Sequence, residues 1–130
     1  MASSVIENPI LNSPFTEPSR HFKFGDQGIT DEITAGRRSS ENFIPIPKAK
    51  KKGKQLVLSD EWLAERVEPN TFVNQLRDRV KLWREGGYKH VTKTTARLLE
   101  HWTASDRTRR LFFCQIEALE TAIYTARGPK

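Results

Sequence analysis

The chain has 130 residues and a formal net charge of +6, from 22 Lys and Arg against 16 Asp and Glu. A chain of this length holds at most one ordinary domain, which excludes a multidomain enzyme. Only 36% of the residues are apolar, and residues 59–130 contain all three Trp and both Tyr. We therefore expect any hydrophobic core to lie in that second half, near the lower size limit for a domain without disulfides or metals.

The positive charge does not by itself identify a partner, because residues 1–58 and residues 59–130 carry equal shares of it. Cys114 is the single cysteine and cannot form an internal disulfide, and three His with one Cys match no zinc-binding spacing. The sequence has no secretory signal and no apolar run of the roughly 18 residues that a membrane helix needs. We expect a cytoplasmic protein with no membrane partner.

Residues 1–58 are predicted to form an extended arm. Five of the seven prolines fall there, and each proline fixes φ and removes a backbone donor. Phe and Ile recur in this half, alternating with polar residues or Pro as in short strands and docking segments. The arm either packs on the rest of the protein, with at most a short hairpin, or is a loosely ordered tail.

A lysine-rich linker occupies residues 48–54, KAKKKGK. Its lysines are Lys48, Lys50, Lys51, Lys52 and Lys54. This density of charge prevents packing and suits either a phosphate backbone or water. The run is thus either a nucleic-acid contact or a solvated connection to the helical region, and Arg37 and Arg38 are candidates for the same nucleic-acid contact.

Residues 59–130 are predicted to be a helical region. Ser59, Thr92 and Ser105 or Asp106 are suited to cap helix starts, and Gly86-Gly87 is suited to end a helix. The expected helices span residues 59–67, 70–85, 93–103 and 106–126. The expected fold class is therefore mainly α, with about four helices preceded by the extended Pro/Phe-rich arm.

The last of these helices is apolar over most of its girth. Its two adjoining stripes are Phe112, Ile116, Leu119 and Ile123, and Leu111, Ala118 and Ala122. Such a helix must be covered on several sides. Because the chain has few other elements to cover it, we expect a further part of the protein to pack there.

No autonomous catalytic set is found in the sequence. It contains no GxxxxGK[ST], GxGxxG, GxSxG or HExxH motif. Cys114 lies in an apolar helical run, where burial would make its thiol a poor nucleophile. We therefore expect no enzymatic activity from this chain alone.

Gln115 is the residue that a purely structural helix does not explain. In helical projection it lies between the two apolar stripes, where an unpaired amide would cost about 1–3 kcal/mol. A glutamine amide offers a donor and an acceptor side by side, which complements N7 and the N6 amino group of adenine. The alternative is a core glutamine bonded to its own protein.

A set of segments carries a resemblance to a known family. The segments are NPILNSPF (8–15), RHFKF (20–24), GITDEI (28–33), GRRSS (36–40), IPIPKAKKKGKQ (44–55), VKLWREGGY (80–88) and LFFCQIEALETAIY (111–124). Together they resemble the N-terminal region of type III restriction enzyme helicase subunits, which are DEAD/DEAH-box-like ATPases related to bacterial restriction endonucleases. The most specific segment is the last, which resembles the adenine-reading Q motif of that family.

The resemblance implies a site and a set of partners. Gln115 would contact adenine, with Phe112, Phe113 and Arg110 near the base, whereas Glu117 faces away from Gln115 and is interpreted as structural. The cofactor implied for the full-length family is ATP with Mg²⁺. The implied partners are double-stranded DNA, a modification methyltransferase subunit and the remainder of the helicase if the gene is split.

Two hypotheses follow. Family members continue into a Walker A loop and two helicase lobes, so the first is that the chain is the incomplete N-terminal part of a larger α/β helicase. That complete protein would be an ATP-dependent restriction endonuclease or helicase, a hydrolase, and the fragment alone would be inactive. The second hypothesis is a small independent basic helical protein that binds nucleic acid or a partner subunit.

Overall fold

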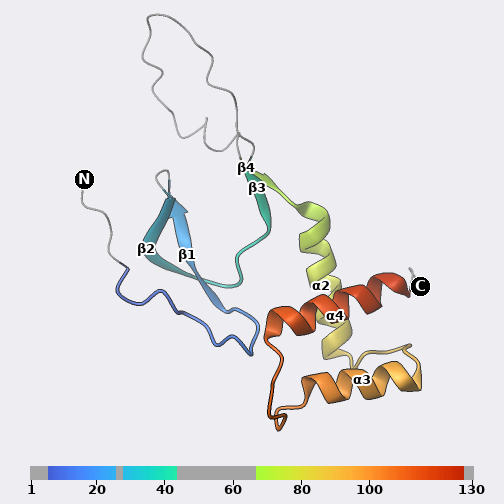
Figure 1. Ribbon diagram of the computed structural model, residues 1–130. Coiled ribbons are helices and arrows are strands. Elements are labelled where there is room, and N and C mark those ends of the chain that lie inside the picture. Colours follow the sequence, from blue (N-terminus) through green and yellow to red (C-terminus); the bar gives the residue numbers. More distant parts are fainter. Residues whose placement is uncertain (1–5, 26–27, 44–66, 128–130) are drawn as a thin grey trace, which may run out of the picture.

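The computed structural model describes residues 6–25, 28–43 and 67–127, which form three helices and two small antiparallel sheets (Figure 1). The strands are β1 (Arg20–Gly25), β2 (Gly28–Ala35), β3 (Glu41–Phe43) and β4 (Val67–Pro69). The helices are α2 (Thr71–Glu85), α3 (Lys93–Thr103) and α4 (Phe113–Ala126). Strand β1 pairs with β2 and β3 pairs with β4, and the three helices gather at the other end of the described chain (Figure 1).

The prediction of the fold class is confirmed only in part. Helices are present, but a mainly α protein with four helices is not confirmed. Three helices are present among the described residues, and two small sheets accompany them. The helix expected at 59–67 lies outside the described residues except for Val67, which belongs to β4 instead. No helix in the described ranges is long and apolar enough to cross a membrane.

The N-terminal arm is fixed onto the hairpin by Asn12. Its side-chain oxygen accepts from the backbone N–H groups of Ser19 and Arg20, at 3.1 and 3.3 Å, and its Nδ2 donates to the Arg20 carbonyl at 2.9 Å. Strand β1 then pairs antiparallel with β2, with Phe22 opposite Ile33. These bonds lie within residues 1–58 and order the described part of the arm itself. One contact of the arm with the helical region is the Pro14 carbonyl, which accepts from the Phe113 N–H at 2.8 Å.

The loop after the hairpin is held on the first turns of α2. Asn74 of α2 accepts from the Ser40 N–H at 2.8 Å and donates to the Ser40 carbonyl at 3.1 Å. Asn70 contributes its backbone N–H to the same carbonyl at 2.9 Å. These bonds fix the chain close to Arg37 against the helical end of the molecule.

The fully enclosed part of the structure is small. Among the described residues, the buried apolar side chains are Val80 and Trp83 of α2 and Leu99 of α3. The centre of the Trp83 ring lies 4.9 Å from the centre of the Tyr88 ring and 5.6 Å from that of the Tyr124 ring. The buried apolar side chains of α2 lie in its second half, whereas Phe72 at its start is 75% exposed.

Two helix boundaries confirm the sequence prediction. Helix α3 spans the residues expected, and Thr92 caps it by accepting from the Thr95 N–H at 3.2 Å. Helix α2 ends at Glu85 with Gly86 as its cap, and Gly87 follows with φ of 82°, a conformation that glycine adopts without strain.

The predicted start of the last helix is wrong. Helix α4 begins at Phe113, and residues 104–112 form a loop instead of a first turn capped by Ser105 or Asp106. The Phe112 N–H donates to the Gln115 side-chain oxygen at 2.9 Å, and the Phe113 N–H donates to the Pro14 carbonyl at 2.8 Å. The start of α4 is therefore set by a glutamine at the third helical position and by the distant arm.

Candidate functional site

Three of the four residues expected to contact adenine lie on one exposed surface at the start of α4. Gln115 bonds to Phe112, and Phe15 of the arm packs on Phe112 with ring centres 5.6 Å apart. The Arg110 guanidinium carbon lies 4.5 Å from the centre of the Phe15 ring. We call these four residues, Phe15, Arg110, Phe112 and Gln115, the α4 entry cluster.

The expectation that Gln115 is buried between apolar stripes is wrong. The side chain is exposed, and its Oε1 already accepts from the Phe112 N–H. The amide therefore needs no ligand to avoid an unpaired buried group. Its oxygen has a second lone pair, and its Nε2 carries two donors, so the amide can still present a donor and an acceptor to a molecule at the surface.

Phe113, the fourth expected residue, lies toward a different group of side chains. The guanidinium carbons of Arg37 and Arg84 are 5.6 and 5.1 Å from the centre of its ring. These distances are within the range of cation–π attraction. Phe113 thus supports a set of ion pairs beneath α4 and does not join the α4 entry cluster.

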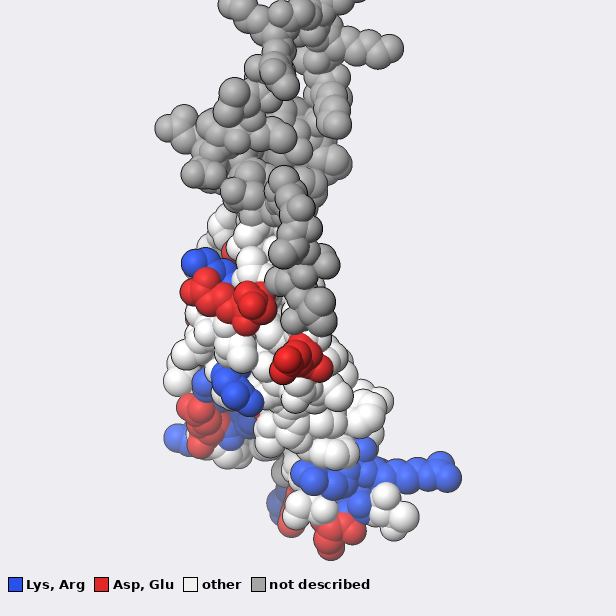
Figure 2. Space-filling view, turned by 90° about the vertical axis from the view of Figure 1, so that its left-hand side faces the viewer, with Lys and Arg blue, Asp and Glu red and all other residues white. Residues whose placement is uncertain are grey.

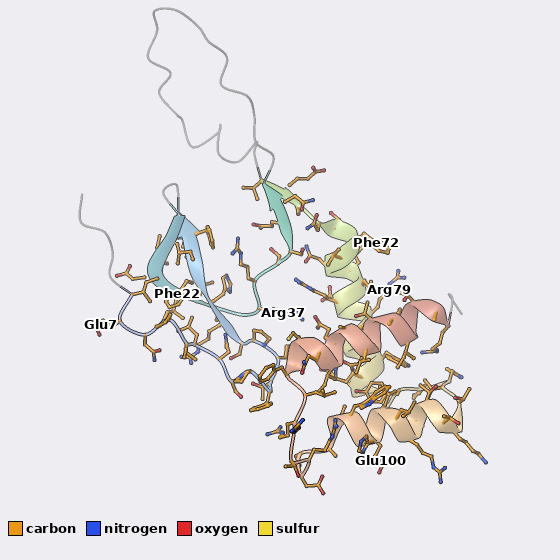
Figure 3. The ribbon with its side chains drawn as sticks, in the orientation of Figure 1. Glu7, Phe22, Arg37, Phe72, Arg79 and Glu100 are labelled. Atoms are coloured by element: carbon orange, nitrogen blue, oxygen red, sulfur yellow. The ribbon has the colours of Figure 1, made fainter. Side chains whose placement is uncertain are left out.

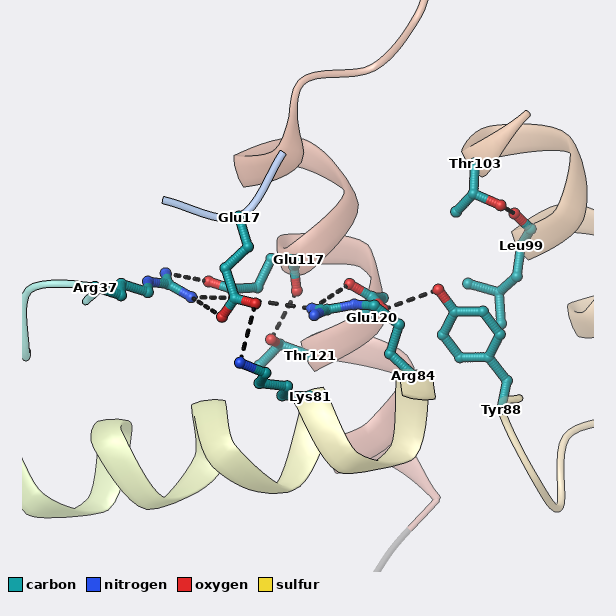
Figure 4. Close-up of polar contacts among 10 residues, drawn as sticks. All are labelled: Glu17, Arg37, Lys81, Arg84, Tyr88, Leu99, Thr103, Glu117, Glu120 and Thr121. Carbon is teal, nitrogen blue, oxygen red and sulfur yellow. Dashed lines mark hydrogen bonds and ion pairs between the residues drawn. The ribbon is translucent and has the colours of Figure 1, made fainter. Parts of the chain in front are cut away.

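The ion pairs form a connected network between the arm, the loop after β2, α2 and α4 (Figure 4). Arg37 donates from Nη1 and Nη2 to the two carboxylate oxygens of Glu117, at 2.5 and 2.6 Å. Glu17 of the arm lies 3.4 Å from the Lys81 ammonium and 3.9 Å from Arg37. The expectation that Glu117 is structural is consistent with this position.

The deepest member of the network is Glu120, which is 0% exposed. Arg84 donates to it from Nε and Nη2, at 2.7 and 2.9 Å, and the Tyr88 hydroxyl donates to it at 2.9 Å. A buried carboxylate is tolerated when its lone pairs are bonded in this way. We call Glu17, Arg37, Lys81, Arg84, Tyr88, Glu117 and Glu120 the ion-pair network.

The network shifts the pKa values of several of its members. Burial alone would raise the pKa of Glu117, but the hydrogen bonds and charge of Arg37 outweigh it and lower the pKa below its ordinary value. Burial, together with the hydrogen bond to Glu120, raises the pKa of Tyr88 above its ordinary value. The hydrogen bonds to Glu117 raise the pKa of Arg37 despite its partial burial. All three shifts favour the protonation states that the network requires.

The residues expected to contact nucleic acid do not form one surface in the described structure. Lys48, Lys50, Lys51, Lys52 and Lys54 lie outside the described residues. Arg37 lies between the hairpin and α4 (Figure 3), and because Glu117 occupies its guanidinium, a DNA contact would require breaking that pair. Arg38 is exposed, with its guanidinium carbon 3.9 Å from the centre of the Phe24 ring. Figure 2 shows basic and acidic side chains intermixed over the middle of one face, and basic side chains gathered at the lower end of the described part.

Sequence reasoning missed Arg84, Tyr88 and Glu120. Glu120 did carry a signal, because it falls on the same helical stripe as Phe112, Ile116 and Ile123, where a carboxylate must have a partner if it is buried. Its partners come from the end of α2 and the turn after it, and no local pattern connects those segments to α4.

Cys114 and the possible metal ligands of the described residues are the remaining candidates for a chemical site. The expected burial of Cys114 is wrong, because the side chain is exposed. The described residues contain no group of three or more His, Cys, Asp or Glu side chains placed to hold a metal ion.

No protein-family model matches the chain, and neither a curated protein nor a solved structure matches it.

Proposed function

We propose that the chain is the N-terminal part of an ATP-dependent, DNA-acting restriction endonuclease or helicase subunit, to which it contributes the glutamine helix that contacts adenine. The proposal rests on the resemblance of several segments, above all residues 111–124. The observation that supports it most directly is the exposed Gln115 amide, which is oriented by the backbone N–H of Phe112, a residue whose ring packs on Phe15.

The α4 entry cluster has groups that complement an adenine ring. The Gln115 Nε2 would donate to N7 of the base, and the free lone pair of Oε1 would accept from the N6 amino group. Phe112 is 47% exposed and offers a face for stacking. Arg110 adds a positive charge next to this surface. The remainder of the helicase would supply the groups that bind the triphosphate, so this chain alone is expected to hydrolyse nothing.

Two substitutions of Gln115 separate an adenine contact from a capping role. Gln115→Glu keeps an acceptor for the Phe112 N–H but removes the donor to N7, and Gln115→Ala removes both. NMR titration of the 130-residue chain with ATP should shift the backbone amide signals of residues 112–116, and GTP should shift them less. Both substitutions should weaken the response to ATP, whereas Gln75→Ala on the exposed part of α2 should not.

Two outcomes would overturn the adenine contact. The first is a Gln115→Glu chain that responds to ATP as the unchanged protein does, because only the cap would then matter. The second is an equal response to ATP and GTP. DNA-stimulated ATP hydrolysis above background by this chain would contradict the proposed dependence on a further part of the protein.

The proposed DNA contacts are the lysine run and Arg38, with Arg37 available only if its pair with Glu117 opens. Each phosphate contact lowers the logarithm of the binding constant by about 0.9 per decade of salt. Replacing Lys50, Lys51 and Lys52 with Ala should therefore flatten the salt dependence of binding to double-stranded DNA. An unchanged slope would remove the run from the DNA interface.

A second candidate function, a small independent protein that binds a partner, is favoured by a different observation. Large apolar side chains of the described part are exposed, including Phe72 at 75%, Leu82 at 69% and Ile10 at 74%. Exposed apolar groups of this kind are typical of surfaces that another protein covers. The genomic sequence after codon 130 discriminates between the two, because a GxGKT motif encoded there in any frame favours the helicase subunit.

A further inference from the structure

The loop that joins α3 to α4, residues 104–112, carries positive charge that the protein does not neutralise. Arg107, Arg109 and Arg110 occupy three of four consecutive positions, and Asp106 is the only acidic residue of the loop. In the described ranges, no ion pair joins any of the three arginines to a carboxylate. Arg110 lies over the Phe15 ring, which leaves Arg107 and Arg109 as the cations available to a ligand.

These two arginines line an open pocket of about 510 Å³. The other residues of its lining are His101, Ala104, Asp106 and Thr108. The Arg107 Nη1 atom is buried and has no hydrogen-bond partner within the described part of the chain. Leaving such a donor unsatisfied costs about 1–3 kcal/mol, and more when the group is charged. That atom is shielded from solvent, so an anion in the pocket would be bound by the exposed Arg109 and by the other guanidinium donors of Arg107.

A second basic pocket of the described structure differs in this respect. It has a volume of about 320 Å³ and lies where the loop after β2 meets α2, lined by Arg37, Arg77 and Lys81 among others. Glu17 also lines it and pairs with Lys81, and Glu117 occupies Arg37. Its charges are therefore largely compensated from within, whereas those of the 104–112 loop are not.

We propose that the 104–112 loop binds the phosphate backbone of a nucleic acid, with Arg107 and Arg109 as the contacting residues. A guanidinium fork donates two parallel hydrogen bonds to a phosphate, and the Thr108 hydroxyl can add a third donor. The pocket is open, so it suits a phosphate of a long polymer that passes over the surface. The inference deepens the DNA-binding part of the proposed function and rests on it, but it does not depend on the role of Gln115.

The test measures binding of double-stranded DNA by the 130-residue chain across a series of salt concentrations. Arg107→Ala with Arg109→Ala should weaken binding at least tenfold and reduce the slope of log K against log salt by about 1.8, because each contact contributes about 0.9. Arg97→Ala, on an exposed position of α3, removes the same kind of charge and is the matched control. Arg109→Ala alone is the second variant, to be used if the double variant does not fold. Arg109 is exposed, so its removal should not affect folding.

Three results would overturn the proposal. One is a double variant whose affinity and slope equal those of Arg97→Ala. Another is an unchanged chain that binds no DNA. The last is a double variant that loses binding of inorganic phosphate or ATP but keeps its DNA affinity, because the pocket would then serve a small anion. An equal response to ATP and GTP in the Gln115 experiment would count against the proposed adenine contact. It would not count against DNA binding by the 104–112 loop.

Discussion

Arg84 and Glu120 form a bidentate ion pair that connects the end of α2 to the middle of α4. Nε and Nη2 of Arg84 each donate to a different carboxylate oxygen, and Tyr88 adds a third hydrogen bond. The pair lies in a structure whose described apolar core is limited to Val80, Trp83 and Leu99. A large share of the specificity with which α2 meets α4 is therefore polar.

Removing one partner of this pair should destabilise the protein strongly. Glu120→Ala leaves the partly buried Arg84 guanidinium with only the Glu117 carboxylate, 3.9 Å away and already bonded to Arg37. We expect a loss of about 3 kcal/mol in the free energy of unfolding. Urea unfolding followed by circular dichroism measures it. Glu100→Ala, at an exposed position of α3, should change the midpoint little. Equal midpoints for the two variants would show that the pair contributes nothing.

The Arg37–Glu117 pair should show energetic coupling. The two side chains are 23% and 16% exposed, and a double-mutant cycle with Arg37→Ala and Glu117→Ala should give a coupling of about 1 kcal/mol or more. The exposed Lys23–Glu32 pair is the comparison, with side chains 58% and 63% exposed, and its coupling should be near zero. A cycle that gives the same coupling for both pairs contradicts the assigned role of Arg37.

Glu117 should make stability fall in acid. Its pKa is lower in the folded protein than the ordinary value of 4.5, so its contribution is fully present above that value. The contribution disappears as pH falls through the folded pKa, because protonation removes the charge that Arg37 binds. Urea midpoints between pH 6 and 2 should therefore decline less in Glu117→Gln than in the unchanged protein. Parallel declines would remove Glu117 from the acid response.

Tyr88 should ionise only at high pH. Its raised pKa means that the neutral hydroxyl is favoured in the folded state, so its contribution to stability is present below the ordinary value of 10.0 and is lost as pH rises beyond it. Absorbance at 295 nm reports tyrosinate. The component that disappears in Tyr88→Phe should titrate above the ordinary range and only as the protein unfolds; ionisation of that component near pH 10 in folded protein would contradict the buried hydrogen bond.

The sequence predicted those elements whose determinants are local. Helices α2 and α3 follow from apolar periodicity, the Thr92 cap and Gly86-Gly87, all within a few residues of the boundaries they set. Pairing of β3 with β4 was not predicted, because it joins segments that are distant in sequence and each strand is only three residues long. Short strands leave little periodic signal.

The error at Gln115 has a specific cause. The amide lies on the side of α4 that carries Ala118 and Ala122, and this side is exposed and not covered by apolar side chains. The helix begins at Phe113 and uses the amide to bond the Phe112 N–H. Phe112 has no side-chain acceptor, so the usual cap sequence was absent and the glutamine at the third helical position was not interpreted as part of a cap. The acceptor for Phe113 comes from Pro14, which no local pattern could indicate.

The pairing of Arg37 with Glu117 also constrains how the chain can be made. The two residues are 80 positions apart, so during translation Arg37 leaves the ribosome well before its carboxylate exists. At about 5–20 residues per second, the wait lasts on the order of 4–16 seconds. The bond between Arg37 and Glu117 can therefore form only after the last helix emerges, so the loop after β2 joins α4 late in synthesis, whereas the β1–β2 hairpin can form early.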